Sequence, residues 1–398
     1  MTAHPEGCAA TVQQQIQYIK DQAPIVKGPR RVLVIGASTG YGLAARIAAA
    51  FGSNAATLGV FFERPSMRGK PASPGWYQTV AFEKAAQAAG LYHKSINGDA
   101  FSKEVKQMAV EAIKRDLGQV DLVVYSLAAP QRKDPYTDPP GHLYKSCLKT
   151  IGTPLTIDTI DTTKRVLHST TIDAATEEEV EATCKVMGGE DWERWVEALE
   201  EADVLSEGAH TVAFSYIGPQ RTRAVYRDGT IGRAKDHLEA TAKKLDRRFK
   251  QHGGRALVSI NKAVVTQASS AIPFIPMYIS ALFRVMKDKG LHEDCIQQLY
   301  RLYAENLYSG APLQLDDQGR IRLDDLEMRG EVQEAVDALL EKVTSENFDT
   351  LIHFEGYETA FLNLFGFNVP GTDYNADVEV DHKLEGLIPQ TNGQPAEV

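Results

Sequence analysis

The sequence predicts an α/β protein built on a doubly wound parallel sheet with helices on both faces. Short apolar segments alternate with longer helical ones from residue 31 to 127, and the alternation resumes between 208 and 266. The apolar segments are nearly continuous, which is typical of parallel strands buried on both faces. Hydrophobic residues make up 43% of the 398 residues and charged residues 24%, so the chain can fill a large core.

Apolar segments and the helical segments between them predict the order of elements. The strands expected first are 31–36, 56–63, 91–98 and 120–128, with helices at 42–52, 76–89 and 101–116. The sheet is expected to continue with a strand at 208–218, a helix from about 232 to 252, a strand at 255–266 and a mostly helical segment at 267–346. Apolar residues at helical spacing predict the buried side of the 232–252 helix: Ile231, Ala234, Leu238, Leu245 and Phe249.

The segment between the two halves of the sheet, 130–206, has a different composition. It begins with prolines, continues with the threonine-rich alternation TPLTIDTIDTTKRVLHSTTID and ends in an acidic helical stretch. We interpret it as an inserted β-hairpin plus helices. We expect this element and the helical segment 267–346 to form a lid on the substrate side of one enlarged domain, 1–398. The last residues, from 389 on, are predicted to be a frayed tail.

Charge, cysteine positions and hydropathy exclude several classes of function. The net charge of -10 disfavours binding to nucleic acids and to anionic membrane surfaces. The four cysteines are scattered without the spacing of a metal site, so we expect reduced thiols and no metal. No basic and apolar leader opens the sequence, and no apolar run is long enough to span a bilayer. These features predict a cytoplasmic protein without stable membrane association.

A glycine loop follows the first predicted strand. The segment VLVIGASTGYGLAARIA runs from an apolar strand through Gly36, Gly40 and Gly42 into an alanine-rich helix. Glycines let the backbone approach a pyrophosphate closely, and the helix N-terminus supplies free N–H groups and a partial positive charge. In this strand–loop–helix order, the loop predicts a Rossmann-type dinucleotide site rather than a plain turn. Further contacts are expected from Ala37, Ser38, Thr39 and Tyr41.

Glu63, at the end of the second predicted strand, indicates which dinucleotide binds. An acidic residue at this place accepts hydrogen bonds from the adenosine ribose hydroxyls and repels an added 2′-phosphate. Two like charges about 4 Å apart repel by about 4 kcal/mol at an effective dielectric constant of about 20, which predicts NADH rather than NADPH. The alternative is a solvated strand end at which Glu63 pairs with Arg64.

Residues at other strand ends complete the predicted cofactor site. Asp99 and Ala100 follow the third strand, where they can contact the adenine, although an aspartate there can also serve only as a cap. Small residues in YSLAAP leave room for the nicotinamide half of the cofactor, with tight packing of the turn as the alternative. The contacts predicted at these strand ends are Phe62, Asp99, Ala100, Leu127 and Ala128.

Two tyrosines and one lysine form the candidate catalytic group. In SYIGPQRTRAVYRDGTIGRAKDHLE, Tyr216 ends a strand, Tyr226 lies in the following loop and Lys235 falls in the first turn of the next helix. Eight residues separate Tyr226 from Lys235, so we expect a bend at Gly229 and Gly232 to bring the two side chains to one site. The pair resembles the Tyr and Lys of short-chain dehydrogenases, which lie one helical turn apart. The alternatives are purely structural roles as a loop aromatic, a strand core residue and a solvated lysine.

Seven motifs together provide a more specific resemblance. GASTGYG, GVFFERP, GDAFS, SLAAP, the Tyr-x8-Lys pair, VVTQASSAIP and FGFNVPGTDYNADV occur in this order along nearly the whole chain. In this combination the sequence resembles the FabV class of enoyl-acyl-carrier-protein reductases and their trans-2-enoyl-CoA reductase relatives. Family members generally have a further leading segment, usually a strand, before the part that matches TAHPEGC. We therefore expect either a shortened start or a missing sheet edge.

The resemblance implies a reaction and a role for each candidate residue. NADH would deliver hydride to the β-carbon of a trans-2-enoyl thioester of acyl carrier protein or coenzyme A, and the enolate would be protonated at its α-carbon. This is the last reductive step of fatty acid elongation. Tyr226 and Lys235 would stabilise the enolate, Lys235 would also hold the nicotinamide ribose, and Tyr216 would hold the thioester carbonyl. The residues implied to contact the nicotinamide carboxamide are Val264, Val265 and Thr266. The resemblance also implies a monomer.

Two other functions are compatible with the same residues. A short-chain-dehydrogenase-type carbonyl or alcohol oxidoreductase would use the same tyrosine and lysine on a C=O bond. A non-catalytic NAD-binding protein would keep the fold without turnover. The sequence does not distinguish acyl carrier protein from coenzyme A as the carrier of the substrate.

Overall fold

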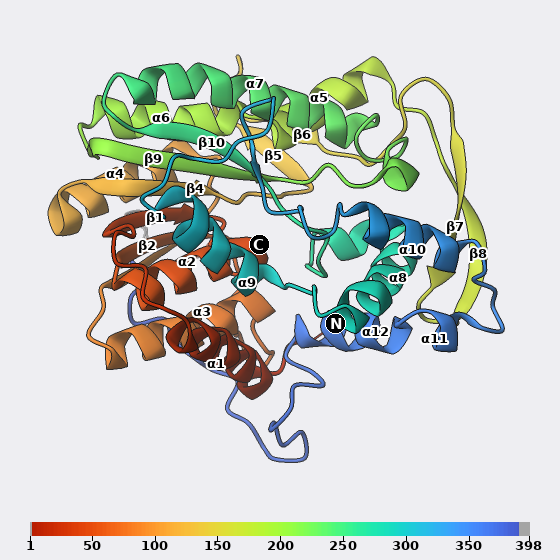
Figure 1. Ribbon diagram of the computed structural model, residues 1–398. Coiled ribbons are helices and arrows are strands. Elements are labelled where there is room, and N and C mark those ends of the chain that lie inside the picture. The colour runs from red at the N-terminus through yellow and green to blue at the C-terminus, as the bar shows by residue number, and fades with distance from the viewer. Residues whose placement is uncertain (1, 390–398) are drawn as a thin grey trace.

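The computed structural model describes residues 2–389, and one sheet of seven parallel strands forms its centre (Figure 1). Across the sheet the strands stand in the order β11-β10-β9-β4-β1-β2-β3. Their bounds are β1 (Arg31–Ile35), β2 (Ala56–Phe61), β3 (His93–Asn97), β4 (Val120–Tyr125), β9 (Leu205–Ser215), β10 (Arg255–Ile260) and β11 (Ile321–Arg322). Strand order reverses between β1 and β4, as in Rossmann-type folds, so the predicted doubly wound sheet is confirmed. The two-residue strand β11 was not predicted, because it is too short to show a pattern.

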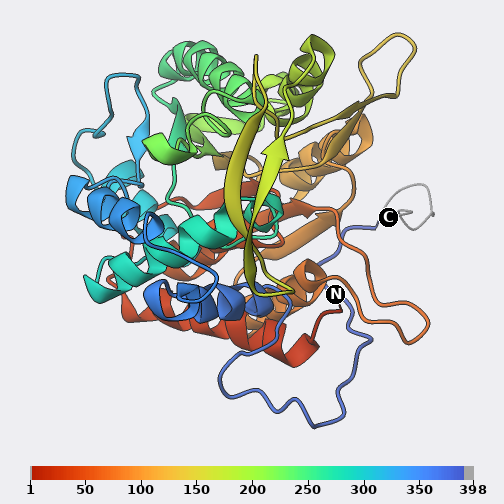
Figure 2. The ribbon, with the colours of Figure 1, turned by 90° about the vertical axis from the view of Figure 1, so that its right-hand side faces the viewer.

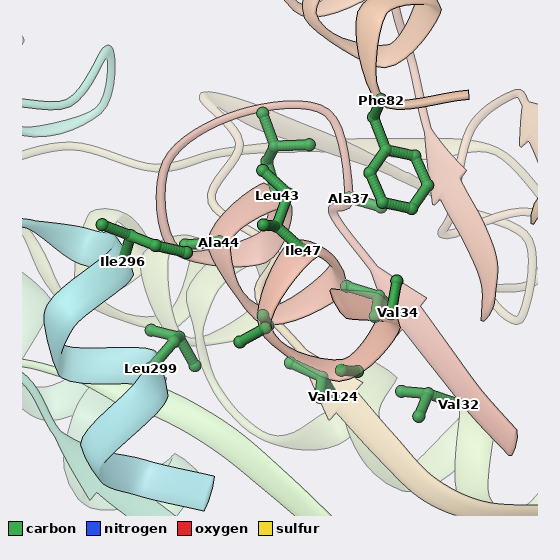
Figure 3. Packing of buried hydrophobic residues seen from close by; sticks show 14 of the residues in the cluster. Val32, Val34, Ala37, Leu43, Ala44, Ile47, Phe82, Val124, Ile296 and Leu299 are labelled. Atoms are coloured by element: carbon green, nitrogen blue, oxygen red, sulfur yellow. The ribbon is translucent and has the colours of Figure 1, made fainter. Parts of the chain in front are cut away.

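The strands are buried on both faces, which explains their continuous apolar runs. Val32 and Val34 of β1 belong to one hydrophobic cluster, whereas Leu33 and Ile35 belong to the cluster on the opposite face. This alternation follows from the two-residue period of a strand. Figure 3 shows Val32 and Val34 close to side chains of the helix that follows the glycine loop.

Helices cover both faces of the sheet (Figure 1). The first cluster contains residues of α1 (Pro5–Asp21), α2 (Gly40–Ser53), α3 (Pro74–Ala88) and α9 (Cys295–Arg301). The second contains residues of α4 (Lys103–Ala112), α6 (Glu190–Glu201) and α7 (Thr230–Lys250). The buried side predicted for α7 is confirmed at all five positions. The short helices are η1 (Ile113–Leu117), η2 (Gln220–Thr222), η3 (Ser269–Ala271) and η4 (Leu302–Leu307).

The inserted segment differs from the single hairpin with lid helices that we expected. It holds two antiparallel hairpins and two helices: β5 (Gln131–Asp134) with β6 (His142–Lys145), β7 (Leu155–Asp161) with β8 (Val166–Ile172), α5 (Glu177–Met187) and α6. Helix α6 is the crossover between the parallel neighbours β4 and β9 rather than part of a lid. Parallel neighbours require such a crossover. It buries Trp192 and Trp195 completely in the cluster that also holds sheet residues.

A third hydrophobic cluster contains residues of α8 (Ile275–Asp288), α10 (Gly330–Leu340), α11 (Phe348–Leu351) and α12 (Phe354–Asn363). Of these helices, α8 and α10 lie within 267–346, the segment that we predicted to be mostly helical, and β11 lies between them. Hairpin β7–β8 contributes Ile160 and Ile172 to this cluster, and Figure 2 shows the hairpin beside α8. Within residues 2–389, no helix is both long and apolar enough to cross a membrane. The predicted frayed tail lies, except for Pro389, outside the described residues.

Candidate active site

The glycine loop forms a close-packed turn between β1 and α2. Gly36 has a φ of 85°, and a Cβ atom there would lie 2.1 Å from the carbonyl oxygen of Ser126. A Cβ atom on Gly42 would lie 1.8 Å from the carbonyl oxygen of Gly36. Thr39 is the N-cap of α2, and its side chain makes no hydrogen bond to the amides of the first turn. This glycine-lined helix N-terminus fits the pyrophosphate of a dinucleotide.

Glu63 lies beside the glycine loop, where its carboxylate accepts hydrogen bonds from two serines. Ser38 of the loop donates to Oε1 at 2.7 Å, and Ser73, the N-cap of α3, donates to Oε2. The alternative of an ion pair with Arg64 is wrong. Burial raises the pKa of Glu63, and the two serine hydrogen bonds oppose that shift. Because each carboxylate oxygen has a second acceptor position, Glu63 can still accept a hydrogen bond from a ribose hydroxyl.

The residues predicted at the other strand ends lie in different environments. Asp99 accepts a hydrogen bond from the backbone amide of Phe101 at 2.9 Å, so one oxygen does act as a cap. Ala100 is buried, and its carbonyl accepts hydrogen bonds from Lys106 Nζ at 2.8 Å and from the Trp195 indole at 3.1 Å. Three further cofactor contacts were predicted at these strand ends. Of these residues, Phe62 and Ala128 are exposed and Leu127 is half-buried.

The segment implied to hold the nicotinamide lies next to the glycine loop. A Cβ atom on Gly40 would stand 3.4 Å from Cγ2 of Thr266. Tyr41 contributes to this junction, because its hydroxyl donates to the carbonyl of Lys262 at 2.8 Å. Ser269, which the sequence reasoning missed, holds the segment in shape. It accepts a hydrogen bond from the Thr266 amide at 2.8 Å and donates to the Val264 carbonyl at 2.7 Å. The remaining member of the segment, Val265, is buried.

Tyr216 and Tyr226 contact each other beyond the end of β9. Their rings are 5.2 Å apart in an edge-to-face arrangement. Tyr226 is buried, and this burial raises the pKa of its phenol. The predicted bend at the glycines is present. A Cβ atom on Gly232 would lie 1.8 Å from the carbonyl oxygen of Arg227, and one on Gly229 would lie 2.4 Å from that of Val225.

Lys235 approaches the same end of β9 from α7. Its Nζ atom lies 3.5 Å from the carbonyl oxygen of Phe214. The helix begins at Thr230, so Lys235 lies in the second turn and not in the first, as we had expected. Burial lowers the pKa of Lys235 to about 8, and Glu239 opposes that shift. Lys235 and Tyr226 both lie near the end of β9, but within residues 2–389 they form no direct hydrogen bond with each other.

A buried carboxylate contacts this group and was missed by the sequence reasoning. Glu327 Oε1 accepts hydrogen bonds from Tyr278 at 2.6 Å and from Tyr216 at 3.1 Å, and Oε2 accepts one from the Ala263 amide at 2.7 Å. In the sequence, Glu327 is one of four acidic residues in the stretch DDLEMRGE, and nothing local distinguishes it from the other three. Its partners come from segments far away in the chain, so no local pattern indicates them.

Three family models match the chain in succession. Residues 1–68 match the NAD(P)H binding domain of trans-2-enoyl-CoA reductase, and residues 70–308 match the trans-2-enoyl-CoA reductase catalytic region. Residues 315–378 match the enoyl reductase FAD binding domain.

The residues of the third match do not fit a flavin dinucleotide. The first helix of this region, α10, has an acidic first turn at Glu331. Negative side chains at a helix N-terminus oppose the binding of a pyrophosphate. We therefore assign no chemical step to a flavin.

Individual relatives match almost from end to end. The enoyl-[acyl-carrier-protein] reductase [NADH] of Cytophaga hutchinsonii is 58% identical over 98% of this chain and 97% of its own length. The trans-2-enoyl-CoA reductase [NADH] of Ruminiclostridium cellulolyticum is 54% identical over 97% and 96%, respectively. The crystal structure of the Treponema denticola trans-2-enoyl-CoA reductase in complex with NAD is 48% identical. It matches with a TM-score of 0.91 and covers 97% of both chains. These matches and the glycine-lined site confirm the resemblance noted in the motifs: the chain belongs to the family of NADH-dependent enoyl-acyl-carrier-protein and trans-2-enoyl-CoA reductases.

Proposed function

We propose that this chain reduces the trans-2 double bond of an enoyl thioester to the saturated acyl thioester, with NADH as the reductant. The observation that carries the proposal is the placement of Tyr226, Tyr216 and Lys235 at one end of β9. There Tyr41 contacts Phe214 with ring centroids 5.7 Å apart, which links the group to the glycine loop. The names of the relatives, which specify NADH and an enoyl thioester of acyl carrier protein or coenzyme A, support the same reaction.

The cofactor site is proposed from the glycine loop outward. NADH, when bound, supplies the hydride that adds to the β-carbon of the substrate. The N-terminus of α2 holds the pyrophosphate, Glu63 accepts hydrogen bonds from the adenosine ribose, and Asp99 and Ala100 contact the adenine. The backbone of 264–266 meets the carboxamide, and Lys235 contacts the nicotinamide ribose.

Tyr226 is proposed to respond to the charge that develops on the substrate. When hydride adds to the β-carbon, the π electrons of the double bond move toward the thioester carbonyl and form an enolate. A buried hydroxyl that is already in place stabilises this charge without reorganisation. The raised pKa of Tyr226 keeps its proton available as a donor at neutral pH. The enolate then takes a proton at its α-carbon from the Tyr226 hydroxyl, which regains a proton from solvent. This completes the addition of hydride and proton across the double bond.

Lys235 and Tyr216 are proposed to assist the same step. A cation near Tyr226 lowers the free energy of negative charge on the phenol oxygen. Tyr216 donates a second hydrogen bond to the thioester carbonyl. The family resemblance further supports a monomer that accepts substrates carried by acyl carrier protein or coenzyme A, and we propose that it acts in the cytoplasm.

The reaction is tested by measuring NADH oxidation with crotonyl-CoA, longer enoyl-CoAs, enoyl-acyl carrier protein and simple ketones. We expect turnover with the enoyl thioesters and none with ketones. Ketone reduction without enoyl reduction would instead indicate a carbonyl reductase. Binding of NADH without any turnover would indicate a non-catalytic protein. The ratio of kcat/KM for the two thioester carriers identifies the preferred one.

The role of Tyr226 is tested by Tyr226→Phe. Because removal of one preorganised donor costs on the order of 10²- to 10³-fold in kcat, we expect a loss of that size with little change in KM for NADH. Tyr303→Phe is the matched control. Its hydroxyl is also buried but donates to the carbonyl of Ala45 within the helix layer. Turnover by Tyr226→Phe within a few-fold of the control would overturn the assignment.

A further inference from the structure

Glu327 is a fully buried carboxyl group between the sheet and the third hydrophobic cluster. It lies in the connection between β11 and α10, and its partners are on three other segments. Tyr216 follows β9, Ala263 follows β10 and Tyr278 lies in α8. Gln333 donates from α10 to the Glu327 carbonyl at 2.7 Å and to the Tyr278 hydroxyl at 3.3 Å. Glu327 is therefore enclosed by polar partners next to the residues assigned to the substrate.

The hydrogen atoms available in this network limit what Tyr216 can do. A tyrosine hydroxyl has one hydrogen, and an ionised carboxylate can only accept. If Glu327 is ionised, Tyr216 and Tyr278 both donate to Oε1, and Tyr216 has no hydrogen left for a substrate carbonyl. If Glu327 is the neutral acid, its own hydrogen can be donated to the Tyr216 oxygen. The hydroxyl hydrogen of Tyr216 is then available to the substrate.

Several groups around Glu327 influence which form prevails. Burial raises the pKa of Glu327, and Asp324 in the same connection adds to this shift. Lys262 after β10 opposes it, as do the hydrogen bonds from Tyr278 and from the Ala263 amide. Tyr216 beyond β9 and Tyr41 in α2 also face the carboxyl. Together these groups raise the pKa of Glu327, which favours its neutral acid form.

We propose that Glu327 is a positioning residue whose neutral acid form donates a hydrogen bond to Tyr216 and thereby directs the Tyr216 hydroxyl to the thioester carbonyl. This inference rests on the proposed function. Through the Ala263 amide, the same carboxyl also anchors the backbone immediately before the segment that we assign to the nicotinamide.

The test compares Glu327→Gln, Glu327→Leu, Tyr216→Phe and the double variant Glu327→Leu/Tyr216→Phe, all in the full chain. The amide of Gln can accept from Ala263 and donate to Tyr216, as the neutral acid does, so we expect kcat to fall only about threefold. Leu has neither group, so Glu327→Leu should lower kcat about as much as Tyr216→Phe, roughly tenfold to hundredfold. In the Tyr216→Phe background, Glu327→Leu should cost little more. A merely structural contribution would instead add to the loss.

The pH dependence of kcat provides a second measurement. A purely structural role of Glu327 would not produce the change described next. In the wild-type chain, kcat should fall as rising pH removes the Glu327 proton, because the ionised form draws the Tyr216 hydrogen to itself. Glu327→Gln should lack this decrease and keep only the alkaline change that comes from Lys235. Glu331→Gln is the matched control, since this exposed carboxylate in the first turn of α10 pairs with Lys289. Its kcat and pH profile should match the wild type.

The outcomes separate this inference from the proposed function. A wild-type chain that does not reduce enoyl thioesters would overturn both. An active wild type with Glu327→Gln as impaired as Tyr216→Phe would overturn only the inference, because the carboxylate would then be the required form. Additive losses in the double variant would also overturn it.

Discussion

Glu63 places a carboxylate at the edge of the glycine loop, where we propose that it meets the adenosine ribose. Its position at the end of β2 follows from the strand, but its orientation depends on Ser38 and Ser73, which hold the carboxylate between the loop and the start of α3. A Cβ atom on Gly75 would lie 2.0 Å from Oε1, so the first turn of α3 packs directly against the carboxylate. The N-terminus of that helix stabilises the negative charge.

The charge of Glu63 is testable by Glu63→Gln. The amide keeps hydrogen-bonding capacity but no longer repels a 2′-phosphate. Because a repulsion of a few kcal/mol is removed, we expect kcat/KM for NADPH relative to NADH to rise by on the order of 10²-fold. Steady-state kinetics with both cofactors measure this ratio. Ser73→Ala is the control, since it keeps the charge and should keep the preference for NADH. An unchanged ratio in Glu63→Gln would show that another group excludes NADPH.

At the scale of elements, the approach of α7 to the loop before it creates the group that we propose to be catalytic. The amide of Gly232 donates to the carbonyl of Tyr226 at 2.9 Å, and Gly229 is the N-cap of the helix. Short-chain dehydrogenases place their Tyr and Lys on one helix, whereas here the tyrosine lies in the loop and the lysine in the helix. The glycines replace the helical turn, because only a residue without a side chain permits this approach.

Gly232→Ala should therefore disturb the loop that carries Tyr226. The added methyl group would overlap the Arg227 carbonyl, so the backbone must shift, at a cost of about 1–3 kcal/mol in stability. We expect a lower Tm and a loss in kcat that exceeds the change in KM for NADH. Gly330→Ala is the matched control at the start of α10, where the nearest atom to a new Cβ is Glu334 Oε1 at 4.0 Å. Full activity of Gly232→Ala would mean that the close approach does not position Tyr226.

At the scale of the whole molecule, a buried ion pair joins the crossover helix to the proposed adenine site. Lys106 Nζ and Asp191 Oδ1 are 2.7 Å apart, and both side chains are almost completely buried. Lys106 also donates to the carbonyls of Ala100 and Phe101, and Asp191 accepts from Tyr125 at 3.2 Å. Helix α6, which we had assigned to a lid, thus supports the loop after β3.

Asp191→Asn should weaken both stability and cofactor binding. It leaves the buried Lys106 charge without a counterion, which costs about 3–5 kcal/mol of stability, and it loosens the loop that holds Asp99. We expect a lower Tm and a higher KM for NADH with a smaller change in KM for crotonyl-CoA. Removing both charges, in Lys106→Met/Asp191→Leu, should recover the Tm while the KM for NADH stays high. A lower Tm with an unchanged KM for NADH would limit the pair to a structural role.

Local patterns in the sequence were sufficient for six of the seven strands of the sheet, for the glycine loop and for the buried side of α7. The spacing of apolar residues reflects the periods of strands and helices. A glycine in such a motif indicates a position where a side chain would collide with neighbouring backbone atoms. The motifs were also sufficient for the family. The predicted role of α6 as a lid helix was wrong, because an acidic amphipathic helix has the same pattern whether it covers a sheet or a substrate site.

The sequence by itself determined the cofactor class and the family, and through the family the reaction. It also indicated the three catalytic candidates, since all of these depend on residues in short, recognisable segments. Only the tertiary structure placed Ser38 and Ser73 on Glu63 and Ser269 on the 264–266 backbone, and only it brought Glu327 to Tyr216, 111 residues away. Such contacts depend on how strands order themselves in the sheet and how helices pack over its ends. No local sequence pattern predicts that arrangement, because the partners meet only after the chain has folded.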